Sequence, residues 1–364
     1  MKTLITLEKQ NHSKTAEYLK PSREHGGNIQ NAVERWGIPH TQWLDLSTGI
    51  SPFSYPLPAV PEAIWQHLPY DNKSLIQAAR SYYGCDYLLP VSGSQEAIEC
   101  LPRIFKQQRI ALPEVGYSEH AYHWQNSDHT IVFYHDIAAL QALVNQHDID
   151  LALVINPNNP TGKRVNSETL IQIANTLKQR KGHLIVDEAF VDCQPRLSLA
   201  NTIPSHDNII VLRSMGKFFG LAGIRMGFVL AATSILASLA DQQSLWHLSG
   251  PTLWAAETAL KDYDWHAKQI KRLNASSNSL AIHLKKHFPN DVITPQPLFV
   301  SITLPVESAE NIFNACATQG ILLRFFDLRN TAAFKHSGLL RFGLPRNTKE
   351  LQRLNDTLNT LQLS

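Results

Sequence analysis

The chain has 364 residues, 43% of them hydrophobic and 18% charged, with a formal net charge of +2. That length favours two domains sharing an interface, and the composition is typical of an ordinary soluble globular enzyme. The balanced charge, with no run of like charges, argues against a nucleic-acid or other polyanionic partner.

Cysteine usage and the N-terminus both indicate a cytoplasmic location. The four cysteines are scattered and form no Cys-x-x-Cys pair, so we expect no disulfide framework and no metal site. The first ten residues carry charges where a secretory signal needs an apolar core. The longest apolar stretch, Gly227 to Ala240, is too short and too often interrupted by Ser and Thr to span a bilayer. We therefore expect no membrane partner.

The N-terminal part begins with a polar segment, residues 1–24, which we expect to form a loose arm. The motif His25-Gly-Gly-Asn28 follows as a small-residue turn ahead of a helix expected over Ile29 to Trp36. Adjacent glycines let the backbone approach a ligand closely, and His25 and Asn28 could hydrogen-bond it. A plain glycine turn before a helix explains the same residues.

From about residue 75 onward, strand-like and helix-like segments alternate. The apolar runs expected to be strands are Tyr87 to Val91, Arg109 to Leu112, Thr130 to Tyr134, Leu151 to Ile155, His183 to Val186, Ile209 to Leu212 and Gly227 to Ala231. Helices are expected between several of them, including Asp136 to Asn145 and Ser167 to Arg180. Near-continuous apolar strands separated by helices predict an α/β fold with a mainly parallel sheet covered on both faces.

Three turns at the ends of these strands carry polar residues. Ser92-Gly93-Ser94 leads from a strand into a helix, where free backbone N–H groups and the helix dipole favour an anion. Asn156-Pro-Asn-Asn159-Pro-Thr-Gly162 and Asp187-Glu-Ala-Phe190 each close an apolar strand. Ligand sites in open α/β sheets lie at this carboxyl edge, and a buried acid such as Asp187 needs a partner there. A rigid turn and a helix cap are the simpler explanations of the Asn-Pro run and of Asp187.

A single lysine, Lys217, lies in the glycine-rich apolar segment Ser214-Met-Gly-Lys-Phe-Phe-Gly-Leu-Ala-Gly-Ile-Arg225-Met-Gly227. Desolvation by the apolar neighbours lowers the pKa of a lysine, and a neutral amine can form a Schiff base. Ser214 and Arg225 are the residue types that hold a phosphate. Together these features predict pyridoxal 5'-phosphate. The other explanation is a buried strand-loop-strand whose lysine reaches out to solvent.

The C-terminal part changes to long helical stretches over Thr252 to Phe288 and then to strands and helices mixed. The segments expected there are strands at Leu298 to Leu304, Ile321 to Arg324 and Leu339 to Phe342, with helices at Ser308 to Thr318 and from Thr348. Arg324 and Arg341 lie in apolar strands, so each is expected to meet an anion. We therefore predict an arm with a substrate-binding turn (residues 1–45), a large cofactor-binding domain (46–250) and a small α+β domain (251–364).

Taken together, these motifs resemble the aspartate-aminotransferase-like (fold type I) family of pyridoxal-phosphate enzymes over nearly the whole chain. The resemblance implies a three-layer fold with a smaller C-terminal domain. It implies that Lys217 forms the Schiff base, that Asp187 pairs with the pyridine nitrogen and that Arg341 clamps the substrate carboxylate. The other cofactor-binding residues it implies are Asn159 at the ring's 3'-oxygen, Tyr117 stacked on the ring with His120 behind it, and Gly93, Ser94, Ser214 and Arg225 at the phosphate.

Within that family the chain is most similar to the branch that decarboxylates L-threonine O-3-phosphate to (R)-1-amino-2-propanol O-2-phosphate in cobalamin biosynthesis. The residues that carry this likeness are His25-Gly-Gly-Asn28, Leu44-Asp-Leu-Ser-Thr-Gly49-Ile, and Phe190, where many aminotransferases have tyrosine. Ser51 departs from the asparagine usual in the branch. Both this branch and histidinol-phosphate aminotransferases, the alternative, take phosphorylated substrates. A non-catalytic regulator is the third hypothesis, and the short leading arm, without a helix-turn-helix pattern, argues against it.

The same resemblance implies how the substrate is held and how the chain assembles. The residues expected at the phosphorylated substrate are His25, Gly26, Asn28, Gly49, Asn159, Arg324 and Arg341. The family is homodimeric, and Tyr70 is a candidate for a residue lent to the partner's site.

Overall fold

The computed structural model describes residues 25–70 and 72–361, and within them a seven-stranded sheet forms the centre of what we call the large body. The strand order is β2-β8-β7-β6-β5-β3-β4. Its strands are β2 (Leu88–Val91), β3 (Arg109–Pro113), β4 (Thr130–Tyr134), β5 (Leu151–Ile155), β6 (His183–Asp187), β7 (Ile209–Ser214) and β8 (Gly227–Leu230). Only β8 runs antiparallel to its two neighbours in this sheet, which confirms the expected mainly parallel arrangement.

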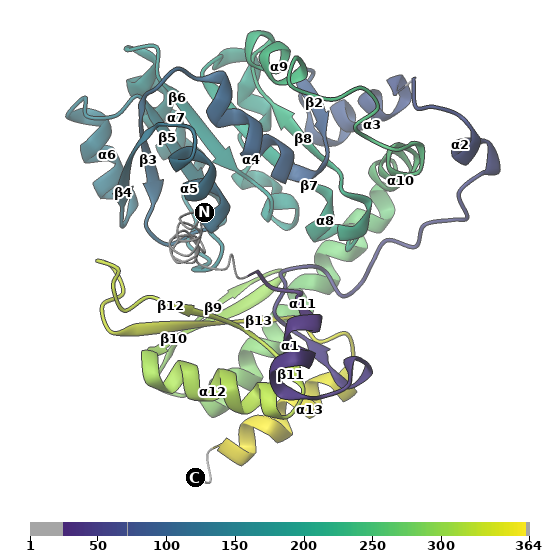
Figure 1. The fold of residues 1–364 in the computed structure, drawn as a ribbon, viewed down its shortest axis with the longest axis vertical. Coiled ribbons are helices and arrows are strands. Elements are labelled where there is room, and N and C mark those ends of the chain that lie inside the picture. The colour runs from purple at the N-terminus through teal and green to yellow at the C-terminus, as the bar shows by residue number, and fades with distance from the viewer. Residues whose placement is uncertain (1–24, 71, 362–364) are drawn as a thin grey trace, which may run out of the picture.

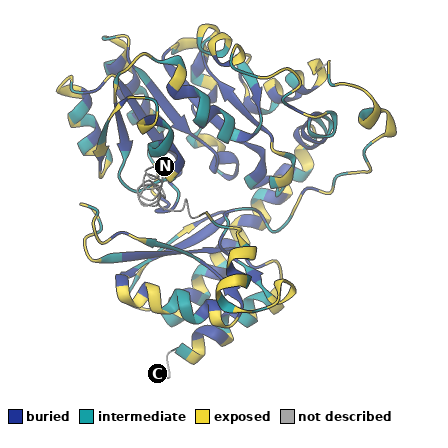
Figure 2. Ribbon diagram, in the orientation of Figure 1, coloured by how far each residue is buried: buried dark blue, intermediate teal, exposed yellow. Residues whose placement is uncertain are grey.

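Both faces of this sheet are covered, which explains why its strands are apolar throughout. On β5, Leu151, Leu153 and Ile155 pack on one side, while Ala152 and Val154 pack on the other. Helices α4 (Gly93–Ile104), α5 (Ser118–Gln125) and α9 (Thr233–Ala240) cover the first side. The second side is covered by α3 (Lys73–Tyr83), α6 (Ile137–Asn145), α7 (Ser167–Lys178) and α10 (Gly250–Leu260). Figure 2 shows the strands buried between helices whose outer faces are exposed.

A second unit, the small body, is built on a four-stranded antiparallel sheet of order β12-β13-β10-β9. Its strands are β9 (Val292–Gln296), β10 (Phe299–Pro305), β12 (Arg324–Asp327) and β13 (Ser337–Gly343). Helices α12 (Val306–Thr318) and α13 (Thr348–Leu361) pack together beside it. The long helix α11 (Tyr263–His287) runs between the two bodies (Figure 1), stacking Trp265 on Phe219 at one end and packing against β9 at the other.

The N-terminal segment packs on the small body. Strand β1 (Leu44–Asp45) pairs in parallel with β11 (Ile321–Leu322), and α1 (Ile29–Trp36) contacts α12. Helix α2 (Glu62–Gln66) lies on a long outer segment at the edge of the large body (Figure 1). The division at residues 45 and 250 stays a proposal.

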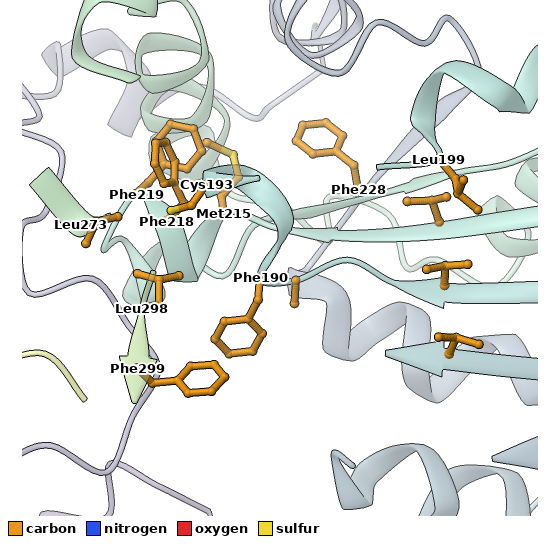
Figure 3. Close-up of a cluster of buried hydrophobic side chains, with 14 of the residues drawn as sticks. Phe190, Cys193, Leu199, Met215, Phe218, Phe219, Phe228, Leu273, Leu298 and Phe299 are labelled. Atoms are coloured by element: carbon orange, nitrogen blue, oxygen red, sulfur yellow. The ribbon is translucent and has the colours of Figure 1, made fainter. Parts of the chain in front are cut away.

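The interior is continuous between the two bodies. Phe190, after β6, and Phe299, at the start of β10, meet edge to face with ring centroids 5.4 Å apart (Figure 3). Leu298 and Leu273 belong to the same buried cluster, together with Phe218 and Phe219 after β7. This apolar contact places the end of β6 next to the small-body sheet, where the polar residues of the candidate site gather.

Most expected segments are present, with ends that match the predicted ones or differ from them by one or two residues. The single strand expected over Ile321 to Arg324 is wrong, because β11 pairs with β1 whereas β12 begins at Arg324 and pairs with β13. Leu323 lies between them, where the chain leaves one sheet and enters another. The arm over residues 1–24 lies outside the described residues. Within residues 25–70 and 72–361 no helix has the length and apolar character needed to cross a membrane.

Candidate active site

The predicted polar residues meet at the carboxyl edge of the large-body sheet. Asp187 ends β6 directly beside Ile155, the last residue of β5, after which the Asn-Pro loop begins. Strand β7 extends two residues further than its pairing with β6 and ends at Ser214. Helix α8 (Met215–Phe218) follows at once and carries Lys217. The parallel order β7-β6-β5 therefore brings the lysine, the acid and the loop to one edge.

Lys217 is the amine at this edge, and its environment disfavours its charge. Its pKa is lowered from 10.5 to about 8, first by burial and then by the nearby cations Arg341 and Arg225, while Asp187 opposes the shift. Its Nζ lies 5.6 Å from the ring centroid of Phe190. A lysine with this pKa has a substantial neutral fraction near pH 8, as a nucleophilic amine requires.

The backbone of Lys217 is fixed by the loop that contains Ser51. The Lys217 carbonyl accepts a hydrogen bond from the Ser51 N–H at 2.9 Å. Gln269 of α11 donates to Ser51 Oγ at 2.8 Å and to the Phe218 carbonyl at 3.3 Å. The serine at position 51 is therefore a structural link between α11 and α8.

Asp187 is buried and held from two sides. Its Oδ2 lies 2.9 Å from Nε2 of His120, and its Oδ1 accepts the Ala189 N–H at 3.0 Å. His120, expected behind Tyr117, is buried on α5 and contacts the acid. The ring of Tyr117 meets His120 edge-on at 6.2 Å, and its hydroxyl donates to Gln95 Oε1 at 3.2 Å. The histidine fixes the carboxylate's orientation.

The N-terminus of α4 supplies the predicted anion cradle. Gly93 has φ +71°, and a Cβ added to it would lie 2.8 Å from Nη2 of Arg225, so only glycine fits beside this guanidinium. The Ser92 side chain makes no capping hydrogen bond. Gly227 is the register partner of Ser214 and lies close to the Ser94 backbone. A Cβ added to Gly227 would lie 2.7 Å from the Ser94 nitrogen. The structure thus brings Gly93, Ser94, Ser214 and Arg225 together, as an anion site requires.

Arg341 is the buried cation on the small-body side. Its Nη1 donates to Asn159 Oδ1 and its Nη2 to the Ser47 carbonyl, while its buried Nε has no partner among the described residues. Burial and the neighbouring Arg324 lower the pKa of Arg341 to about 9, against the opposing charge of Asp45. A guanidinium in this setting gains most from an anion that completes its hydrogen bonds.

The N-terminal turn rests on the loop that contains Ser47. The Gly27 N–H donates to Ser47 Oγ at 2.7 Å, and the Ser47 carbonyl lies where a Cβ on Gly26 would be. Nε2 of His25 lies 3.0 Å from Oε1 of Glu119. The Asn28 side chain accepts the Asn31 N–H at 3.0 Å and so caps α1. The turn is thus placed beside the site, with Asn28 committed to the helix cap in this structure.

Two further predicted positions lie at the site's walls. A Cβ on Gly49 would meet Cε1 of Phe190 at 2.6 Å, so the glycine leaves room for that ring. Arg324 is the register partner of Arg341 on the neighbouring strand, with its guanidinium 5.0 Å from the ring centroid of Phe326. Gly49 therefore lies against the ring that neighbours Lys217, and Arg324 lies beside Arg341.

Sequence reasoning missed several supporting residues. Glu119 is buried and accepts from Gln95 at 3.1 Å as well as contacting His25. Arg213, next to Ser214, is buried in a pair with Glu188 at 3.3 Å and Asp192 at 2.6 Å. In the sequence, Arg213 is visible only as a charge next to an apolar strand, and Glu119 only as a charge beside a motif. Their contacts could not be predicted, because the residues they meet are distant in the chain.

The residues present fit pyridoxal 5'-phosphate on chemical grounds. The site offers a lysine with a lowered pKa, a glycine-lined anion cradle and a buried carboxylate. It also offers the unpartnered Nε of Arg341 for a substrate anion. The individual roles stay predictions.

Comparison with known proteins gives matches over most of the chain. The family model described as aminotransferase class I and II matches residues 61–358. A threonine-phosphate decarboxylase of Pseudomonas aeruginosa is 39% identical over 92% of this chain and 97% of its own length. Another of that name from Sinorhizobium sp is 41% identical over 65% of this chain and 71% of its own.

The fold also matches solved structures. The crystal structure of histidinol-phosphate aminotransferase from Sinorhizobium meliloti in complex with pyridoxal-5'-phosphate has a TM-score of 0.78. The match covers 92% of this chain and 95% of that chain, at 21% sequence identity.

Proposed function

The chain belongs to the class I and II aminotransferase family, and we propose that it is a pyridoxal 5'-phosphate enzyme that decarboxylates L-threonine O-3-phosphate. The product is (R)-1-amino-2-propanol O-2-phosphate, and the step serves cobalamin biosynthesis. The observation that carries this function is the 39% identity to a threonine-phosphate decarboxylase across nearly the full length of both chains. The site chemistry supports it, because a decarboxylase of this type needs a lysine, an acid and a buried arginine in one place.

The cofactor supplies, when bound, a conjugated ring that accepts the electron pair left at the substrate Cα. Lys217 would hold it covalently, and Asp187, oriented by His120, would keep the pyridine nitrogen protonated. Asn159 would donate to the 3'-oxygen, and Tyr117 would pack on the ring. The residues that hold the phosphate in this proposal are Gly93, Ser94, Ser214 and Arg225.

Arg341 binds the substrate carboxylate through its fork of N–H groups, with Asn159 beside it. An arginine that fixes the carboxylate decides which bond at Cα is aligned for cleavage. Lys217 Nζ, with its lowered pKa, can return a proton to Cα once the carboxylate has left. The residues assigned to the phosphorylated end of the substrate are His25, Gly26, Asn28, Gly49 and Arg324.

A histidinol-phosphate aminotransferase is the second candidate, because the chain shares that fold. Phe190 argues against it. Its ring lies next to Lys217 and brings no hydroxyl to this side of the site. A tyrosine there would add a hydrogen bond to the 3'-oxygen, and without it transamination is disfavoured.

We also propose that the enzyme is a homodimer. Large apolar side chains are exposed on the outer segment around α2 and near residue 246, namely Trp65, Leu68, Tyr70, Leu245 and Trp246. Tyr70 is 75% exposed and meets Trp246 edge-on at 5.7 Å. A second copy would cover this surface and receive Tyr70. If sedimentation shows a fully active monomer at the assay concentration, the dimer proposal is contradicted.

A cytoplasmic location stays a prediction.

Product analysis with both phosphorylated amines tests the function. The purified holoenzyme is incubated with threonine phosphate, and separately with histidinol phosphate and 2-oxoglutarate. We expect carbon dioxide and aminopropanol phosphate from the first mixture and no glutamate from the second. Glutamate formation without carbon dioxide release would falsify the decarboxylase assignment.

A further inference from the structure

The loop Asn159–Gly162 crosses three neighbouring strands of the small-body sheet and bonds to each of them. Arg341 on β13 donates to Asn159 Oδ1. Ser301 on β10 donates from Oγ to the Pro160 carbonyl at 2.7 Å. Gln296 on β9 donates from Nε2 to the Gly162 carbonyl at 2.8 Å. The contacts follow the strand order β13-β10-β9, so the sheet holds the loop along its length.

The base of the same loop is fixed to the large body. The Asn156 side chain pairs with the Val165 backbone, donating at 2.9 Å and accepting at 3.0 Å. Asn158 Nδ2 donates to the Val115 carbonyl at 3.0 Å, and the Gly162 N–H closes on the Asn158 carbonyl at 2.8 Å. The loop therefore bridges the two bodies, with its first two asparagines in structural hydrogen bonds and Asn159 at the site.

The two small-body anchors are buried and well supported. Ser301 is 2% exposed and is the register partner of Arg341 on the adjacent strand. Gln296 is 4% exposed, and its Oε1 accepts from Arg164 at 3.3 Å and from Gln194 at 3.1 Å. Buried groups with all their partners satisfied hold a rigid geometry.

Arg341 also fixes which way the Asn159 amide faces. Because Oδ1 accepts from the guanidinium, the Nδ2 group is left to donate on the other side. A donor in an enzyme site must be held within a fraction of an ångström to keep its effect. The direction of the Asn159 N–H therefore depends on the loop's attachment to β10 and β9.

We propose that Ser301 and Gln296 are positioning residues that hold the Asn159 N–H at the cofactor's 3'-oxygen. They act through the loop backbone and touch neither cofactor nor substrate. The inference rests on the proposed cofactor role of Asn159. It adds that the small-body sheet, through these two side chains, sets the electronic state of the bound cofactor.

The test is a pH titration of the visible absorbance of the holoenzyme, since a donor at the 3'-oxygen stabilises its deprotonated form and lowers the spectral pKa. We expect Ser301→Ala to raise that pKa by about 0.5 to 1 pH unit, the size of losing part of one charge-assisted hydrogen bond. Ser301→Thr keeps the hydroxyl and should restore the wild-type value. Ser238→Ala is the matched control, because its Oγ bonds only the Ser234 carbonyl on exposed α9.

Asn159→Ala gives the reference shift. If Asn159→Ala raises the spectral pKa and Ser301→Ala does not, the positioning role is wrong. If Asn159→Ala leaves the spectral pKa unchanged, the assigned role of Asn159 fails and the inference fails with it. Neither outcome depends on which bond of the substrate breaks, so failure of the decarboxylase assignment would be seen separately in the products.

A second variant guards against misfolding at the buried serine. Gln296→Glu removes the donor to Gly162 and keeps an acceptor for Arg164 and Gln194. We expect this variant to raise the spectral pKa, as Ser301→Ala does. Thermal unfolding shows whether Gln296→Glu is folded. If the folded variant has the wild-type spectral pKa, the proposal is contradicted.

Discussion

Replacing Arg341 by methionine should cost activity while leaving folding stability nearly unchanged. Arg341 is 5% exposed, and no described carboxylate lies within ion-pair distance of it. Methionine fills similar space without the charge. The comparison is Arg213→Met, because Arg213 is equally buried but is paired with Glu188 and Asp192.

The expected loss of activity follows from the carboxylate that Arg341 is proposed to bind. Two charge-assisted hydrogen bonds contribute about 3 to 4 kcal/mol together, so kcat/KM should fall roughly 10²- to 10³-fold. Because this contact is made to the carboxylate of the bound substrate, a large part of this fall should be in KM. Arg346→Lys, at an exposed arginine, should keep wild-type kinetics.

The expected stability is a balance of two effects. Burial and Arg324 lower the pKa of Arg341 to about 9, so its charge is a cost to the folded protein that methionine removes. The lost hydrogen bonds to Asn159 and the Ser47 carbonyl cost about 1 to 3 kcal/mol each and offset that gain. The net change in the free energy of unfolding should lie within about 2 kcal/mol of zero. Arg213→Met leaves two buried carboxylates and should lose about 3 to 5 kcal/mol.

The assay combines urea unfolding of the cofactor-free proteins with kcat/KM measured per folded protein. If Arg341→Met unfolds as easily as Arg213→Met, Arg341 has a structural role that the proposal does not allow. If Arg341→Met keeps kcat/KM within about fivefold of wild type, Arg341 does not bind the substrate carboxylate, since that contact contributes more.

Two further predictions concern Lys217 and Gly49. Because the pKa of Lys217 falls from 10.5 to about 8 on folding, the unfolded chain binds more protons in that window, so stability should rise from pH 8 to 10.5. In cofactor-free protein the free energy of unfolding should rise by about 1 to 3 kcal/mol more than it does in Lys217→Met. Urea unfolding of both proteins across this pH window measures the difference, and the same pH dependence in both would contradict the prediction. Gly49→Ala pushes a methyl group into Phe190 and should lower the free energy of unfolding by about 1 to 3 kcal/mol, measured by thermal unfolding. Gly223→Ala is the control, because a Cβ there meets nothing within 4 Å. Equal melting temperatures for the two variants would disprove the contact.

The central sheet could be predicted because its strands are buried on both faces. Leu151 to Ile155 is a continuous apolar run, and the loop after it begins at the residue where the strand ends. Parallel strands then place Asp187 and Lys217 at one edge without any knowledge of side-chain contacts. The positions of the acid and the lysine therefore followed from topology.

The long-range partners could not be predicted from local sequence. His25 and Glu119 are 94 residues apart in the chain and meet only because the N-terminal turn packs beside α5. The two strands β11 and β12 are adjacent in sequence, yet their partners β1 and β13 come from opposite ends of the chain. An asparagine ahead of a helix, such as Asn28, can serve either as a ligand-binding residue or as a helix cap. Only the fold shows that its side chain accepts the Asn31 N–H and caps α1.

The fate of the substrate's carboxyl carbon tests the proposed decarboxylation most directly. Threonine phosphate labelled with ¹³C at the carboxyl group is turned over by the holoenzyme in deuterated water, and gas and product are analysed together. We expect one labelled carbon dioxide for each aminopropanol phosphate, with one deuterium at the former Cα. Label retained in a 2-oxo acid, with the amino group transferred to the cofactor, would contradict it.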